Sequence, residues 1–186
     1  MNQGIQMTIS IKASFLLMLL MSLTLQAGEF TFADAKIQIP AGFEGPMTQD
    51  MGNGMSNIGF RKPHKENQHA TLLQISVWSP GQRFPSLTNE ELKQGASKYL
   101  LQFLSGVARK RSDFKKSDIE FVEISGVPAA KVKWTGNFDN ISMHGVMYCY
   151  VYNSKIISLH TQDMVDFEGV FINKAVASFE SITLKK

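Results

Sequence analysis

Cysteine is nearly absent from this chain of 186 residues, in which Cys149 is the only one. One thiol cannot form a disulfide within the chain, so packing and hydrogen bonds must hold the fold together. Cys149 lies in an apolar run, where a free cysteine is ordinarily buried and unreactive. We therefore expect a buried, inert thiol.

A large excess of charge of one sign is missing as well, because 19 Lys and Arg residues face 16 Asp and Glu residues. This near-balance argues against a role in nucleic-acid binding. The chain also lacks a Gly-rich phosphate loop, zinc-ligand spacing, paired catalytic carboxylates, repeats and low-complexity segments. We expect no cofactor, and we predict that the protein is not an enzyme.

Long apolar runs are scarce outside Ala13–Leu25, which follows Lys12 and precedes the small residue Ala27. A positive start, a short apolar core and a small residue at the cleavage position are typical of a secretory signal peptide. The core is shorter than the roughly 20 residues that a membrane span needs. The sequence therefore predicts a cleaved signal peptide at 1–27 and a single domain at 28–186. It predicts a periplasmic or secreted protein with no stable membrane span.

A predicted β-hairpin dominates the second half of the chain. Two β-prone runs, Val146–Tyr152 and Lys155–Thr161, flank the turn pair Asn153–Ser154. The two faces of this hairpin are set by alternation. One face carries Tyr148, Tyr150, Tyr152, Ile157 and Leu159, and the other carries Met147, Cys149, Val151, Ile156, Ser158 and His160. Both faces are largely apolar, so we expect central strands covered on both sides, with the long helix over the tyrosines.

The remaining chain alternates strand and helix signals. Thr88 and Glu91 match a capping box that opens a helix with an apolar stripe running to Val107. Period-2 alternation in 70–79 places Leu73, Ile75 and Val77 toward the core. The other expected elements are a bent strand or hairpin at 30–40, a loop at 41–57, strands at 57–63, 118–124 and 128–134, and a closing helix at 167–182 capped by Asp163 or Asp166.

Strands joined as hairpins and interrupted by two helices indicate an α+β domain, an α/β/α sandwich whose central antiparallel sheet has helices on both faces. The pattern resembles the Mog1/PsbP-like superfamily. The resemblance rests on Ile37–Phe43 (IQIPAGF), the pair Tyr99–Leu100, Ile124–Ala130 (ISGVPAA) and the closing helix with Phe167, Phe171, Ser178 and Phe179. It implies this same sandwich and a binding or assembly factor without a shared catalytic set.

Three groups of side chains are candidate binding sites. The basic residues Arg109, Lys110, Arg111, Lys115 and Lys116 could dock an anionic partner or remain a solvated helix end. The tyrosines Tyr148, Tyr150 and Tyr152 could line a ligand groove or lie under a helix. The methionines Met47, Met51 and Met55 could bind Cu(I), as could a cluster around Met143 and Met147, or they could simply cover apolar sheet edges.

Histidines offer one further hypothesis. His144 lies opposite Asp163 in the predicted hairpin, so a hydrolase site would require these two residues to converge with a serine such as Ser142 or Ser158. His64 and His69 flank a polar segment that we expect to be a solvated loop. The sequence favours an exported, non-enzymatic binding or accessory module acting with an envelope partner. Copper binding is the first alternative and hydrolysis the second.

Overall fold

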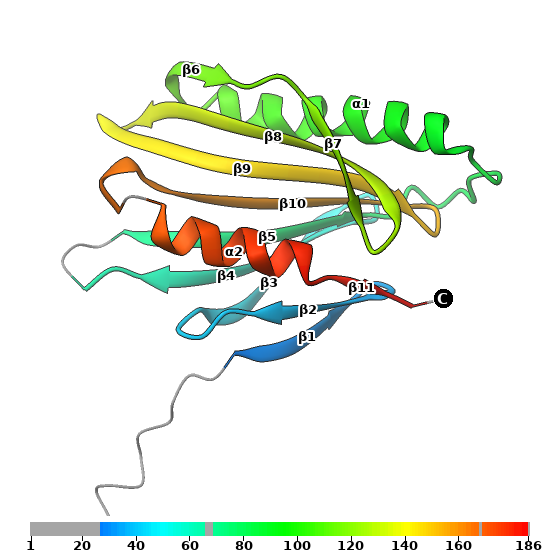
Figure 1. Ribbon diagram of the computed structural model, residues 1–186, viewed down its shortest axis with the longest axis horizontal. Coiled ribbons are helices and arrows are strands. Elements are labelled where there is room, and N and C mark those ends of the chain that lie inside the picture. The colour runs from blue at the N-terminus through cyan, green and yellow to red at the C-terminus, as the bar shows by residue number, and fades with distance from the viewer. Residues whose placement is uncertain (1–26, 66–68, 168, 186) are drawn as a thin grey trace, which may run out of the picture.

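The computed structural model describes residues 27–65, 69–167 and 169–185. Two antiparallel sheets and two helices make up this part of the chain (Figure 1). The small sheet has the strand order β1-β2-β11, and the large sheet has the order β3-β4-β5-β10-β9-β8-β6, with β7 also paired to β8. The elements are β1 (Gly28–Phe32), β2 (Ala35–Ile39), β3 (Glu44–Gly52), β4 (Met55–Pro63), β5 (Ala70–Trp78), α1 (Asn89–Ala108), β6 (Ser112–Lys116), β7 (Glu120–Ile124), β8 (Val127–Phe138), β9 (Ile141–Tyr152), β10 (Lys155–Met164), η1 (Val165–Phe167), α2 (Val170–Glu180) and β11 (Thr183–Leu184).

The predicted hairpin is formed by β9 and β10 at the centre of the large sheet. Its register confirms the prediction, because Tyr152 pairs with Lys155 and Tyr148 pairs with Leu159. Asn153 and Ser154 both adopt positive φ, which is the geometry of a tight two-residue hairpin turn. The hairpin alternative for 30–40 is also confirmed, by β1 and β2.

Helix α1 packs on one face of the large sheet, mainly over β8 and β9. Its capping box is present as predicted, with the Thr88 side chain accepting from the Glu91 amide and Glu91 reaching back to the Thr88 amide. These bonds lower the pKa of Glu91. Beneath α1 lies an apolar cluster of Ala96, Leu100, Leu104, Ala130, Val132, Trp134, Met147, Cys149, Val151 and Ile156. Cys149 is buried, which raises the pKa of its thiol, as expected for an inert cysteine.

The opposite face of the large sheet is covered by α2 and the small sheet (Figure 1). Tyr148 and Tyr150 belong to this second cluster, where Tyr148 packs edge-on against Phe179 of α2. The expectation that the long helix α1 covers the tyrosines was therefore wrong. Alternation assigned the residues to their faces correctly, but it carries no information about which helix covers which face.

Three expectations about elements need correction. Segment 41–57 is a hairpin of β3 and β4 rather than a loop, because glycines with positive φ at Gly52 and Gly54 make a turn between extended arms. Strand β6 was not anticipated. Helix α2 begins later than predicted, with Gly169 as its N-cap and no side-chain cap, so neither proposed aspartate caps it.

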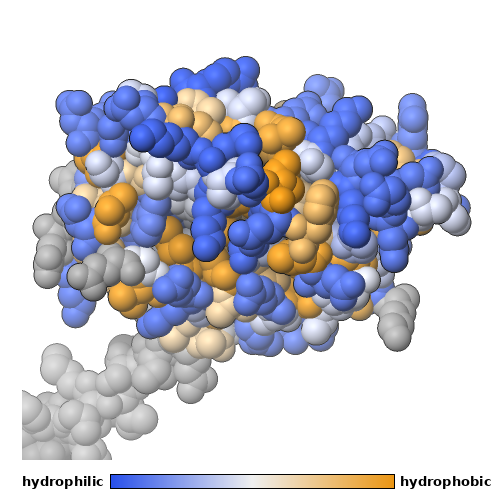
Figure 2. Space-filling model, turned by 45° about the horizontal axis from the view of Figure 1, so that its top comes forward, coloured by the Kyte–Doolittle hydropathy of each residue, from blue (hydrophilic) through white to orange (hydrophobic). Residues whose placement is uncertain are grey.

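The predicted signal peptide falls almost wholly outside the described residues, which begin at Ala27. Among the described helices, none has the length and apolar character required to cross a membrane. The surface seen in Figure 2 mixes hydrophilic side chains with scattered apolar patches rather than one continuous apolar area.

Candidate functional site: a trough beside helix α1

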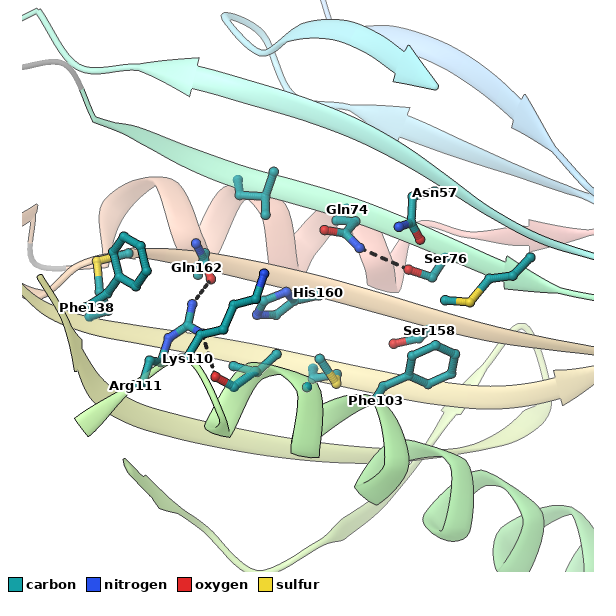
Figure 3. Close-up of a pocket in the computed structure, with 16 residues that line it drawn as sticks. Asn57, Gln74, Ser76, Phe103, Lys110, Arg111, Phe138, Ser158, His160 and Gln162 are labelled. Carbon is teal, nitrogen blue, oxygen red and sulfur yellow. Dashed lines mark hydrogen bonds between the residues drawn. The ribbon is translucent and has the colours of Figure 1, made fainter. Parts of the chain in front are cut away.

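Helix α1 leaves part of its own sheet face uncovered. Strands β4, β5 and β10 continue past the helix, and alternation places polar side chains on this open part. Figure 3 shows side chains from α1 and from these strands on either side of a hollow. Its lining residues are Met55, Asn57, Leu72, Gln74, Ser76, Phe103, Gly106, Val107, Lys110, Arg111, Phe138, Met143, Met147, Ser158, His160 and Gln162.

A second hollow adjoins the first and shares Met55, Phe103 and Gly106 with it. Its other lining residues are Met51, Gly52, Asn53, Trp78, Gln102, Ser105 and Arg109. The two hollows have volumes of about 380 and 710 Å³. We call them together the trough, with a polar end at Lys110 and an apolar end at Met51. Their size is that of ordinary small-molecule sites.

Several polar atoms of the trough have no hydrogen-bond partner among the described residues. Gln74 donates to Ser76 at 3.0 Å, but Asn57 Oδ1, His160 Nε2 and Arg111 Nε are each inaccessible and without a partner. A buried polar atom left unpaired costs roughly 1–3 kcal/mol. Such atoms are not confined to the trough, because Trp134 Nε1, His144 Nε2, the Tyr150 hydroxyl and Thr161 Oγ1 are also buried without a partner among the described residues.

All charged side chains that line the trough are positive, namely Arg109, Lys110 and Arg111. Arg111 is held in place by the Val107 carbonyl at 2.7 Å, by Gln162 Oε1 at 2.5 Å and by the Trp134 ring at 4.4 Å. Its partial burial lowers the pKa of the guanidinium. Arg109 and Lys110 are exposed, so they are free to turn toward a ligand.

His160 contributes an uncharged ring to the floor of the trough. It is only 7% exposed, and burial, with a smaller effect from Arg111, lowers its pKa to about 3. The ring is therefore neutral near pH 7. His160 pairs with Met147 of β9 across the hairpin, on the face that alternation predicted for both residues.

The candidate methionines are divided among hollows. Met51 and Met55 line the apolar end of the trough, whereas Met47 lines a small neighbouring hollow with Asn57 and Gln74. Met143 and Met147 both line the polar end. Among the described His, Cys, Asp and Glu residues, no group of three or more is placed to hold a metal ion.

The predicted basic group is also divided, because the chain turns back into β6 after α1. Lys115 and Lys116 line a different hollow of about 470 Å³ with Lys133, His144 and the start of α2 at Gly169. Burial lowers the pKa of His144 there, an effect that Asp163 partly offsets. The five basic residues therefore do not form one surface.

The tyrosines do not form a groove, because two of them are fully buried. Tyr148 donates to Glu180 at 3.2 Å, and Tyr150 has no partner for its hydroxyl among the described residues. Burial raises the pKa of both phenols. Tyr152 donates to the Lys185 carbonyl, so its hydroxyl fastens the C-terminal segment.

A buried polar cluster joins three segments on the α2 side. His64 Nε2 lies 2.8 Å from Asp163 Oδ1, and Thr71 donates to Asp163 Oδ2 at 2.6 Å. The His64 ring stacks on Phe167 at 3.7 Å between centroids. We had expected His64 to be part of a solvated loop, and this expectation was wrong. The neighbouring residues in the sequence are polar and gave no sign of a pairing with Asp163, which lies 99 positions away.

The hydrolase hypothesis required His144, Asp163 and a serine to meet in one open hollow. Asp163 is fully buried and does not line the hollow that contains His144. Ser142 donates to Asn137, and Ser158 lies on the other face of the sheet, in the trough. This particular arrangement is not formed.

Comparison with known proteins gave matches at the level of structure. No protein-family model matches the chain, and neither does any curated protein. The solved structures that it resembles include cyanobacterial PsbP (CyanoP) from Synechocystis sp. PCC 6803, with a TM-score of 0.59 and 10% identity over 88% of this chain and 95% of that one.

Two further similar structures were found. PA94 from Pseudomonas aeruginosa, a protein of unknown function, has a TM-score of 0.52 and 9% identity over 86% of this chain and 98% of that one. LpqN of Mycobacterium tuberculosis, described as involved in cell envelope biogenesis, has a TM-score of 0.46 and 14% identity over 76% and 85%. The protein therefore has the same fold as cyanobacterial PsbP, which agrees with the fold that the resemblance in sequence implied.

Proposed function

We propose that the protein is an exported, non-enzymatic binding or accessory module that takes part in an interaction or assembly in the cell envelope. We also propose the description α/β/α sandwich, since α1 and α2 pack on opposite faces of the large sheet. The export rests on the predicted signal peptide at 1–27. The single observation that carries the binding role is the trough, where exposed cations and side-chain amides border an uncovered part of the sheet.

A pair of matched photo-crosslinking variants tests this function. Phe138 borders the trough and Phe121 lies on β7 outside it, and their side chains are exposed to nearly equal extents, 46% and 50%. Each is replaced by p-benzoylphenylalanine in the full-length protein, which is then irradiated in its own cells. We expect a discrete product from position 138 only, and its loss when Lys110→Glu is added.

Equal products from positions 121 and 138, or a product from 138 that Lys110→Glu leaves unchanged, would contradict a binding role for the trough. Absence of any product from position 138 under conditions where position 121 gives one would do the same. The Lys110→Glu change lies on an exposed side chain, so it is expected to leave the fold intact.

Copper binding remains a second hypothesis, because Met51 and Met55 border the same hollow. Thioether ligands suit Cu(I). Addition of Cu(I) would then raise the melting temperature of the wild type but not of a Met47→Leu, Met51→Leu, Met55→Leu variant. An equal response of both proteins would eliminate this use of the three methionines.

A further inference from the structure

The two ends of the trough differ in chemistry, and this difference points to a class of ligand. The polar end carries Lys110 with Gln74, His160 and Gln162 on its floor. The apolar end is lined by four apolar side chains, Met51, Met55, Trp78 and Phe103, together with the exposed cation Arg109. We propose, on the basis of the function proposed above, that the trough binds an anionic amphiphile with one aliphatic chain, its charged group at Lys110 and its chain along α1 toward Met51.

Charge complementarity supports the anionic group. The charged residues that line the trough are all cations, and no Asp or Glu lines either hollow. Arg111 is already held by Val107, Gln162 and Trp134, so it supplies a fixed positive charge rather than a mobile contact. An anion placed near Lys110 would therefore meet no repulsion from the trough itself and would reach side-chain amides able to donate hydrogen bonds.

The apolar end supports the aliphatic chain. Met51 is 49% exposed on β3 and lines this end together with Met55, Trp78 and Phe103, so an aliphatic chain placed here would contact apolar side chains. Methionine is flexible and polarisable, so it adapts to chains of varied shape. On β5, Leu72 lines the polar end and Trp78 lines the apolar end, and these residues are six positions apart, or roughly 20 Å along the strand. The trough is thus long enough to separate a charged head from an apolar tail.

Other occupants fit the two ends less well. A neutral sugar would use the amides but leave the cations and the methionines unmatched. A simple anion such as phosphate would use Lys110 but not the apolar end. A peptide segment with an acidic and an apolar residue would share the same chemistry, and it is kept as an outcome of the test.

Titration calorimetry with hexanoate, octanoate and decanoate, below their micelle-forming concentrations, tests the proposal on the mature protein. We expect the dissociation constant to fall about three- to fourfold for each added methylene, because burying one is worth about 0.8 kcal/mol. Decyl sulfate and decyl phosphate are compared with decanoate. Similar dissociation constants for all three would show that the trough recognises the charge of the anionic group and not its shape. 1-Decanol, which has the same chain and no charge, is expected to bind at least about tenfold more weakly than decanoate.

Variants locate the two ends. Lys110→Gln is expected to weaken decanoate binding at least about tenfold and to leave 1-decanol binding unchanged. Lys98→Gln, which removes a lysine on α1 outside the trough, is expected to change neither. Met51→Ser is expected to weaken decanoate more than hexanoate. Circular dichroism of each variant checks that the fold is intact.

A dissociation constant that does not depend on chain length, equal affinity for decanoate and 1-decanol, or decanoate binding that Lys110→Gln leaves unchanged would each overturn the amphiphile. If decanoate fails to bind while position 138 still crosslinks a partner in a Lys110-dependent manner, the ligand class is wrong and the binding role survives. If decanoate does not bind and position 138 gives no Lys110-dependent crosslink, both the ligand class and the proposed binding function are wrong.

Discussion

The two faces of the large sheet are built from alternate residues of the same strands, yet they differ in how their charged groups are held. On the α2 side, Asp163 is fully buried and bonded by both His64 and Thr71. On the α1 side, the exposed cations Arg109 and Lys110 border an open trough. Among the described residues, unpaired buried atoms occur on both faces, for example His160 Nε2 on the α1 side and the Tyr150 hydroxyl on the α2 side, so they do not distinguish the faces. A paired buried carboxylate serves stability, whereas cations beside an open hollow suit binding, and we therefore assign stability to the α2 side and binding to the α1 side.

The largest effect is expected from Asp163→Ala on the closed face. This change leaves His64 and Thr71 buried without their shared acceptor, which should lower the free energy of unfolding by about 3–5 kcal/mol. Gln74→Ala on the open face is the control and should change it by no more than about 0.5 kcal/mol. Urea denaturation followed by circular dichroism measures both, and similar losses would remove the distinction between the faces.

The next effect concerns Gly145, which lies between the two faces. A Cβ at this position would lie 2.5 Å from the Thr161 carbonyl oxygen and from the Trp134 ring. Gly145→Ala should therefore destabilise by about 1–3 kcal/mol. The same change at Gly95 in α1, where the nearest atom is 3.5 Å away, should stabilise by up to about 1 kcal/mol. Thermal unfolding of both variants checks the expected difference in sign.

His160 should make stability depend on pH. Its pKa falls from an ordinary 6.5 in the unfolded chain to about 3 in the fold, so the unfolded state binds more protons between these values. The contribution is fully present above about pH 6.5 and is lost as pH falls toward about 3, amounting to about 2 kcal/mol at pH 5. His160→Gln should reduce the loss of unfolding free energy between about pH 8 and 5 by this amount. An unchanged slope would show that His160 is not held neutral.

The smallest effect distinguishes two buried tyrosines on the closed face. Tyr148 donates to Glu180, so Tyr148→Phe should cost about 0.5–1.5 kcal/mol. Tyr150 has no hydroxyl partner among the described residues, so Tyr150→Phe should be neutral or slightly stabilising. Chemical denaturation of the two variants side by side measures the difference. An equal cost would indicate that the Tyr150 hydroxyl is paired.

Local patterns predicted much of this fold. Alternation set the faces and register of β9 and β10, and the Thr88 capping box marked the start of α1. Local patterns do not record which layer covers which face, so the tyrosines were assigned to the wrong helix. The hairpin of β3 and β4 was missed because its glycines and exposed residues resemble a loop.

The candidate site was predictable only in pieces. The sequence indicated Lys110, Arg111 and Met55, but their convergence depends on α1 crossing the sheet beside β4 and β5. The sequence placed Lys115 and Lys116 in one basic group with Arg109, Lys110 and Arg111. In the structure they lie on β6 and line another hollow. The polar residues of the floor, such as Gln74 and Gln162, lie in strands with alternating polarity, where a solvated face is the ordinary interpretation.

A chemical-shift map of the ¹⁵N-labelled protein with decanoate tests the central claim most directly, because it reports on both faces at once. We expect perturbations to gather on the side-chain amides of Gln74 and Gln162 and on the backbone from 102 to 111. Tyr148 and Phe179 on the closed face should stay unchanged. Perturbations centred on the closed face, or the absence of any with decanoate just below its micelle-forming concentration, would contradict binding at the trough.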